Sequence, residues 1–309
     1  MSRDHIRNAS YDYARLIAVI GIIWFHAHAP GGGIGYSGLA FFVLLLMLLA
    51  LPQITRYRDL PHRAPAVLRY AATRGRRLLV PWLVASAFSG GFKLVEVSQG
   101  TPLAAEFTKE MWLTGTAIHL WFLPFAFAMG IILWPLGRWL RTAPVTVWGP
   151  LSLIFTACAL AALAAVQTNP LPTPLAEWAH ALPAVLLGTA FALTRARPGY
   201  MLGMLVLFVC AALSLQWTVG VLQIALASGL LILCRVIYMR PTALSAAAAR
   251  ASLWIYLIHP AVMTLAVRGD IAPDASTALA VIVTLVSLFI VAIWETIRQG
   301  RPVTGMPAA

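Results

Sequence analysis

The chain has 309 residues; 61% of them are hydrophobic, only 10% are charged, and the mean hydropathy is +0.83. Soluble domains carry about 25% charged residues, so this composition excludes an ordinary soluble protein and indicates a multi-pass membrane protein. A net charge of +12 would suit nucleic-acid binding in a soluble chain, but basic residues also gather in the cytoplasmic loops of membrane proteins, and we predict no nucleic-acid partner.

Ten apolar stretches are candidates to cross a bilayer. A spanning backbone must satisfy its own hydrogen bonds, and the alternating pattern of an outer-membrane barrel is absent, so we predict an all-α fold. No soluble domain fits between the stretches, and we expect one membrane-embedded domain over residues 1–309 with no fused soluble domain. The predicted spans are 11–30, 34–54, 78–98, 119–137, 146–166, 177–194, 200–216, 219–238, 251–267 and 276–297.

Basic residues are distributed unevenly between the two sides of this arrangement. With the N-terminus in the cytoplasm, 18 of the 22 Lys and Arg residues fall on the cytoplasmic side. This bias follows the positive-inside rule, so we predict cytoplasmic termini and an even number of spans. Residues 55–77 then form the main cytoplasmic loop, and residues 31–35, GGGIG, form a flexible outer turn.

The first predicted span contains ionisable residues, which cost at least a few kcal/mol each in a bilayer. Arg15 and His26 are eleven positions apart, within roughly 20° of one helix face and about 16 Å apart along the axis. Asp12 lies one turn before Arg15. The alternative is a structural ion pair together with a histidine at the solvated end of the helix. Three such residues on one face favour a catalytic set. His26 can act as general base, Arg15 can hold an anion, and Asp12 can position Arg15. His28 points elsewhere and is unexplained.

Arg74, Arg76 and Arg77 stand at the cytoplasmic mouth of the third predicted span. They can orient the chain and attract anionic lipid. Three guanidinium groups also suit a polyphosphate, since they donate in forks to phosphate oxygens, and we expect the start of the helix to add to this attraction.

Two later segments contain further polar residues within apolar sequence. Ile118–Pro124, IHLWFLP, contains His119 and Trp121, the latter also typical of an aromatic belt at the outer interface. Ser252–Pro260, SLWIYLIHP, contains Tyr256 and His259 near the middle of a span, where we expect Pro260 to disrupt the helix. These four side chains are candidate substrate-binding residues, and for His259 a hydrogen-bonded core histidine is an equal alternative. No motif with metal-ligand spacing stands out, so no metal is predicted.

In these segments the chain resembles the acyltransferase-3 family of membrane O-acyltransferases. Tyr11–His26 is similar to the family's opening helix, in which Arg, ten residues and His recur as Arg15 and His26. Arg74–Arg77 resembles its cytoplasmic R-x-x-R motif, and HLWFLP and SLWIYLIHP resemble its fourth-helix and late-helix segments. One departure is that Phe41 and Phe42 are followed by VLLL, where many relatives have Ser-Gly at the last two positions. The difference bears on pocket shape and acyl preference.

The resemblance implies transfer of an acyl group, commonly acetyl, from cytoplasmic acyl-CoA to a hydroxyl of a cell-surface carbohydrate or lipid-linked glycan. It implies His26 as the catalytic residue, with Arg15 in support and the Arg74–Arg77 cluster toward the coenzyme. We therefore expect a multi-pass protein of a bacterial-type inner membrane. Whether an acyl-histidine forms stays open, as do the acceptor and the oligomeric state.

Two other functions fit the same residues. A glycan or lipid transporter or flippase would use Arg15 and the histidines as a coupling relay. A non-catalytic subunit of a polysaccharide assembly complex would tolerate substitution of Arg15 and His26. Acyl transfer by the purified protein distinguishes the enzyme from both.

Overall fold

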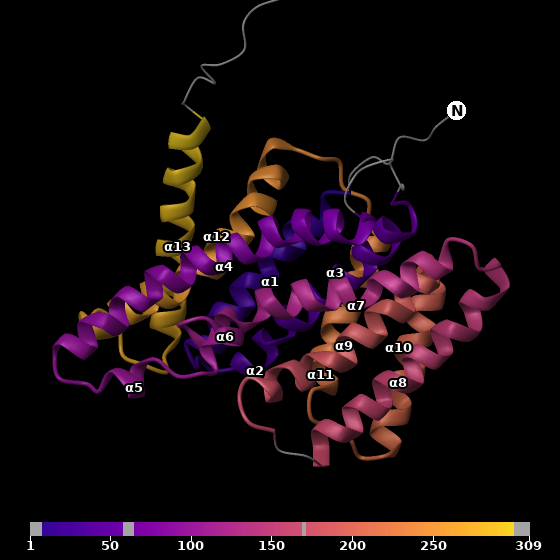
Figure 1. The fold of residues 1–309 in the computed structure, drawn as a ribbon, viewed down its shortest axis with the longest axis horizontal. Helices are drawn as coiled ribbons and strands as arrows, with labels where there is room; N and C mark the ends of the chain where they lie inside the picture. The colour runs from indigo at the N-terminus through magenta and orange to yellow at the C-terminus, as the bar shows by residue number, and fades with distance from the viewer. Residues whose placement is uncertain (1–7, 58–64, 169–170, 300–309) are drawn as a thin grey trace, which may run out of the picture. The chain divides into compact units, whose positions relative to one another are not determined.

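The structure is a computed structural model that describes residues 8–57, 65–168 and 171–299 (Figure 1). These residues form helices joined by short connections, with no strand among them, which confirms the predicted all-α class. Five of the basic residues used to predict the orientation, Arg3, Arg7, Arg58, Arg63 and Arg301, lie outside the described ranges.

Ten helices of at least 16 residues are found in the described ranges, and each overlaps one predicted span. They are α1 (Ser10–His26), α3 (Ser37–Thr55), α4 (Ala66–Ser98), α7 (Phe122–Leu140), α8 (Trp148–Thr168), α9 (Leu175–Leu193), α10 (Pro198–Ser214), α11 (Val221–Val236), α12 (Ala243–Arg268) and α13 (Thr277–Gln299). The short helices are α2 (Gly32–Gly35), α5 (Leu103–Glu106), α6 (Met111–Thr114), η1 (Ile118–Trp121) and η2 (Val145–Val147).

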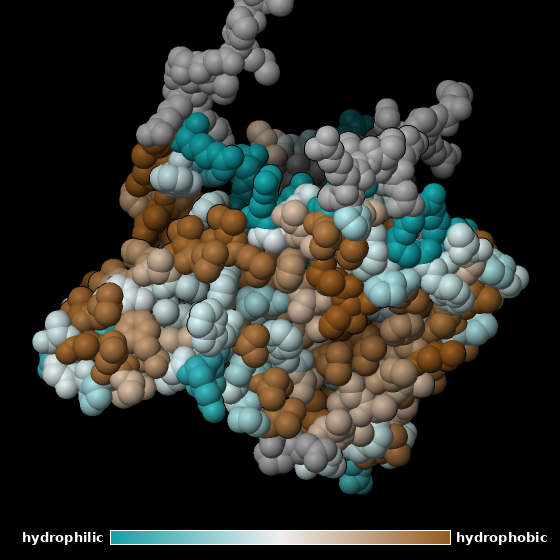
Figure 2. All heavy atoms as spheres, in the orientation of Figure 1, coloured by the Kyte–Doolittle hydropathy of each residue, from teal (hydrophilic) through white to brown (hydrophobic). Residues whose placement is uncertain are grey.

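Seven helical segments of the described chain are long and apolar enough to cross a membrane, and α10 and α11 are shorter apolar helices. The chain is therefore a multi-pass membrane protein, whereas the count of ten spans and the side of the termini stay predictions. Large apolar side chains are exposed on several helices, such as Leu83 and Phe88 on α4 and Leu285 and Phe289 on α13. On the face shown in Figure 2, hydrophobic residues lie along much of both helices, as a lipid-facing surface requires.

Two helices begin earlier than predicted. α4 starts at Ala66, directly after Pro65, so the arginine cluster lies inside the helix and not at its N-terminus. α12 starts at Ala243, because Thr242 and Ser245 form a capping box that satisfies the first backbone donors. The expectation that Pro260 disrupts this helix is wrong, since α12 runs through Pro260 to Arg268.

The chain divides into two compact units, residues 1–38 with 238–309, and residues 39–237. We describe each unit separately, and the expectation of a single domain stays a prediction. In the first unit α1 packs against α12, and α12 packs against α13. Asn8 joins the starts of these helices, because its side-chain oxygen accepts hydrogen bonds from the backbone N–H groups of Ser10 (3.0 Å) and Met239 (3.1 Å).

Small residues bring α1 close to the helices that follow it. A Cβ atom at Gly21 would lie 2.7 Å from the carbonyl oxygen of Gly35, and one at Gly38 would overlap the carbonyl oxygen of Ala18. Such spacing lets two backbones approach closely, as in small-residue contacts between membrane helices. The flexible turn expected at residues 31–35 is therefore a short helix, α2, packed on α1.

In the second unit α8 packs against α9, α10 packs against α8, α9 and α11, and α4 packs against α7. Gly188 of α9 sits where a Cβ atom would be 3.0 Å from the Cα atom of Leu44 in α3. Small residues thus set close helix crossings in both units.

Candidate functional site

Two histidines from distant parts of the sequence form a hydrogen-bonded pair in the first unit. His26 Nδ1 and His259 Nε2 are 2.9 Å apart. Their rings are stacked, with centroids 5.1 Å apart and planes 8° apart. His26 is the last residue of α1, and His259 lies in the interior of α12. The packing of α1 on α12 therefore brings together two residues that are 233 positions apart.

The second ring nitrogen of His259 is also hydrogen-bonded. Its Nδ1 lies 2.8 Å from the backbone carbonyl oxygen of Tyr256. In an uninterrupted helix that carbonyl would accept from the N–H of residue 260. Residue 260 is proline, which has no N–H, so the Tyr256 carbonyl is available to the imidazole. Pro260 thus creates a side-chain acceptor site without ending the helix.

The two histidines differ in exposure. His259 is fully buried, with 0% of its surface accessible, whereas His26 is partly accessible. Aromatic rings from the same unit lie around the pair: Phe25 is 5.5 Å from His26 and 4.3 Å from Tyr36, and Tyr256 is 5.9 Å from His259, between ring centroids. A substrate can therefore approach His26 and not the imidazole of His259.

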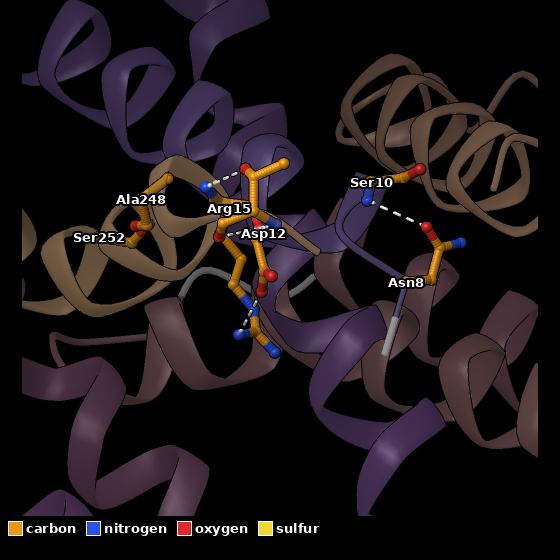
Figure 3. A network of polar contacts seen from close by, with 8 residues as sticks. Asn8, Ser10, Asp12, Arg15, Ala248 and Ser252 are labelled. Carbon is orange, nitrogen blue, oxygen red and sulfur yellow. Dashed lines mark hydrogen bonds and ion pairs between the residues drawn. The ribbon is translucent and has the colours of Figure 1, made fainter. Parts of the chain in front are cut away.

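Asp12 and Arg15 form the predicted ion pair at the other end of α1, with 3.7 Å between Oδ1 and Nη1. Asp12 is buried, and 30% of the Arg15 side chain is accessible. Figure 3 draws them in one polar network with Ala248 and Ser252 of α12, where the Ser252 hydroxyl donates to the Ala248 carbonyl oxygen (2.7 Å). Because α1 is one continuous helix, Arg15 and His26 are about 16 Å apart along its axis and lie near its opposite ends.

Arg74 is held inside the second unit. It donates to the Tyr70 hydroxyl (3.2 Å) and to the carbonyl oxygen of Ala126 in α7 (3.1 Å). Gly130 of α7 makes room for it, because a Cβ atom there would overlap the guanidinium group. Arg74 thus links α4 to α7, a structural role that its position in the sequence did not reveal.

The other two arginines of the cluster are exposed. Arg76 and Arg77 are accessible on α4, and successive positions of a helix point about 100° apart, so the three guanidinium groups do not share one face. The expected contribution of a helix N-terminus is wrong, because Ala66 begins α4 eight residues before Arg74. Any phosphate bound here would rest on side-chain donors.

His119 and Trp121 lie in η1 of the second unit, and both are buried. Gly115, with φ +74°, turns the chain just before them, and the Thr116 hydroxyl donates to the Ser86 carbonyl oxygen of α4. The Trp121 ring packs edge-on against Phe125 at 5.4 Å. Trp121 is therefore part of the protein interior, and the substrate contacts expected of both residues stay predictions.

The structure unites five of the ten predicted site residues in the first unit: Asp12, Arg15, His26, Tyr256 and His259. Arg74, Arg76, Arg77, His119 and Trp121 belong to the second unit. The pairing of His26 with His259 was not predicted. The signal available was the His-Pro dipeptide at 259–260, since the proline releases a carbonyl within reach of the preceding histidine.

No group of three or more His, Cys, Asp and Glu side chains that could hold a metal ion is found among the described residues.

A family model described as an acyltransferase domain matches residues 8–295, nearly the whole chain. The chain therefore belongs to the acyltransferase-3 family and is a membrane acyltransferase by family. No curated protein and no solved structure matches it.

Proposed function

Since the chain belongs to this family, we propose that it transfers an acyl group, most simply acetyl, from cytoplasmic acyl-CoA to a hydroxyl of a cell-surface carbohydrate or lipid-linked glycan. The proposal places it in a bacterial-type inner membrane. The observation that carries it is the His26–His259 pair, in which an accessible imidazole at the end of α1 is hydrogen-bonded to a fully buried one. This is the arrangement that general-base catalysis needs, with a reactive ring and a second group that orients it.

In the proposed step the acceptor hydroxyl oxygen attacks the thioester carbonyl carbon, and its proton moves to His26 Nε2. The bond between the carbonyl carbon and sulfur breaks, the thiolate takes the proton from His26, and an ester and free coenzyme A result. A two-step route uses the same atoms. His26 Nε2 attacks the thioester carbonyl carbon, the bond from that carbon to sulfur breaks, and an acyl-histidine and the thiolate result. The acceptor hydroxyl oxygen then attacks the acyl carbon, the bond from that carbon to Nε2 breaks, and the hydroxyl proton passes to the thiolate. Both routes need an unprotonated Nε2 on His26.

Asp12 and Arg15 have a supporting role in this proposal. The buried Asp12 carboxylate holds the Arg15 guanidinium, which keeps part of its surface accessible. A positive charge held in place inside a span attracts an anionic or carbonyl group of a substrate. At about 16 Å from His26 along α1, Arg15 would contact the donor away from its thioester.

The donor's phosphates are proposed to bind the arginine cluster of α4. Arg76 and Arg77 are exposed and can donate to phosphate oxygens, while Arg74 already donates to Tyr70 and Ala126. We therefore assign the larger share of donor affinity to Arg76 and Arg77. His119, Trp121 and Tyr256 are proposed substrate contacts.

The test uses purified protein in nanodiscs with labelled acetyl-CoA and an extract of surface glycans. His26→Ala should abolish transfer and leave insertion and thermal stability intact. His28→Ala is the matched control, because His28 is an exposed histidine two residues away. Transfer by His26→Ala at the wild-type rate would refute the proposed chemistry, and flux of glycan without acyl-CoA would favour a flippase.

The acceptor is tested in cells. Surface glycans from cells with and without the intact protein should differ by one ester, detected by compositional analysis. Identical ester content would exclude a surface glycan as the acceptor.

A further inference from the structure

We propose that His259 is a positioning residue that, together with Pro260, sets the tautomer of His26; this inference rests on the proposed function. Both ring nitrogens of His259 are hydrogen-bonded, and Pro260 has no N–H that could compete for one of the acceptors. His259 was expected to contact substrate, but it is fully buried.

The Tyr256 carbonyl sets the tautomer of His259. A carbonyl oxygen accepts hydrogen bonds and never donates them, so the contact of 2.8 Å with the Tyr256 carbonyl requires a proton on His259 Nδ1. A neutral imidazole carries only one ring proton, and His259 Nε2 is then an acceptor.

The tautomer of His259 determines the tautomer of His26. The partner of His259 Nε2 is His26 Nδ1, at 2.9 Å, and this nitrogen must now donate. A neutral His26 with its proton on Nδ1 carries its lone pair on Nε2. That nitrogen is the one required as base or nucleophile in either proposed route. The orientation of one hydrogen bond in α12 thereby selects the reactive nitrogen at the end of α1.

Pro260 keeps a backbone N–H from competing with His259 for the Tyr256 carbonyl. With any other residue at position 260, a backbone N–H would compete for the Tyr256 carbonyl. His259 could then rotate or take the opposite tautomer, with the proton on Nε2, and His26 Nδ1 would become the acceptor. The proton of His26 would move to Nε2, and the reactive lone pair would be lost. Pro260 removes this competitor without ending α12.

The same pair also stabilises the protonated state. When His26 takes a proton on Nε2, its Nδ1–H still donates to His259 Nε2, and this hydrogen bond becomes charge-assisted. The leaving thiolate then takes this proton from His26 Nε2. The protons on Nδ1 of His26 and on Nδ1 of His259 stay in place throughout the turnover.

Three variants test the proposal through kinetics. His259→Leu removes the acceptor and should lower kcat by about 100-fold or more, while the KM values for donor and acceptor change by less than about threefold. His259→Gln can place an amide oxygen where Nε2 was and should recover kcat to within about tenfold of wild type. Pro260→Ala should lower kcat by about three- to tenfold, because the competing N–H only shifts a population. Pro135→Ala in α7, an exposed proline inside another helix, is the matched control and should leave kcat unchanged.

The second readout does not depend on activity. Nitrogen NMR of the ¹⁵N-histidine-labelled protein in nanodiscs distinguishes protonated from unprotonated ring nitrogens, and the His26→Ala and His259→Gln variants assign the signals. Wild type should show both His26 and His259 with the proton on Nδ1, and Pro260→Ala should shift both toward Nε2.

A wild-type His259 with its proton on Nε2 would overturn the proposal, as would a His259→Leu protein with wild-type kcat. If His26→Ala retains transfer at the wild-type rate, the proposed catalytic role of His26 fails, and the NMR result still decides whether Pro260 sets the tautomers.

Discussion

The contact between α1 and α3 gives the sharpest prediction about stability. Gly38→Ala would place a Cβ atom over the carbonyl oxygen of Ala18, at 2.9 Å from its carbonyl carbon and 3.1 Å from its Cα atom. These are backbone atoms of a helix and cannot move aside individually. Overpacking of this kind costs about 1–3 kcal/mol, so the two helices must separate or the protein loses that stability.

The assay is thermal unfolding of purified protein in one detergent, followed by circular dichroism. A loss of about 2 kcal/mol corresponds to a decrease in Tm of about 3 °C for a chain of 309 residues, because the entropy of unfolding is about 2.1 cal/mol/K per residue. Gly33→Ala is the matched control, because Gly33 is exposed in the neighbouring α2 and no heavy atom lies within 4 Å of the added Cβ. Equal Tm values for the two variants would refute the close contact of α1 with α3.

Three further predictions concern other contacts. Gly130→Ala should displace the Arg74 guanidinium from the Ala126 carbonyl and lower Tm by a few degrees. An additional Arg74→Ala change should largely remove this effect. A Tm equal to that of wild type would show that the Arg74 side chain does not pack on Gly130. Arg76→Ala with Arg77→Ala should raise the KM for acyl-CoA more than Arg74→Ala does, in initial-rate assays, because both side chains are exposed; an unchanged KM would leave these arginines only a role in orienting the chain. Glu295→Gln should weaken the contact between α12 and α13 by about 0.5–1 kcal/mol, since it removes the carboxylate that pairs with Arg250 (2.8 Å). Adding Arg250→Met to this variant should cause no additional loss of stability in the unfolding experiment.

In the opening helix, α1, the relative placement of the polar residues could be predicted from the sequence. An eleven-residue spacing and the geometry of the α-helix were enough to place Arg15 and His26 on one face, because this relation depends only on local structure. The Asp12–Arg15 pair is local in the same sense, with its members three positions apart, and the structure confirms it. The helical class and the approximate spans follow from apolar length alone.

Hydropathy alone did not predict where α4 and α12 begin or which groups the arginine cluster contacts. The start of α4 at Ala66 and of α12 at Ala243 depends on a proline and on a capping box, which extend the helices beyond their apolar stretches. Arg74 looked like its neighbours in the sequence, yet only packing on α7 commits its donors to Tyr70 and Ala126. Hydropathy averages cannot report either effect.

The sequence by itself determined that this is a helical membrane protein, and its motifs indicated the family and singled out His26. Local periodicity and composition carry that information because each helix satisfies its own backbone. Only the tertiary structure decided which residue His26 contacts. His259 is 233 positions away, and the packing of α1 on α12 brings its Nε2 to 2.9 Å from His26 Nδ1, while the carbonyl released by Pro260 accepts from the other ring nitrogen of His259. A contact of that range depends on the packing of whole helices, which no stretch of sequence contains.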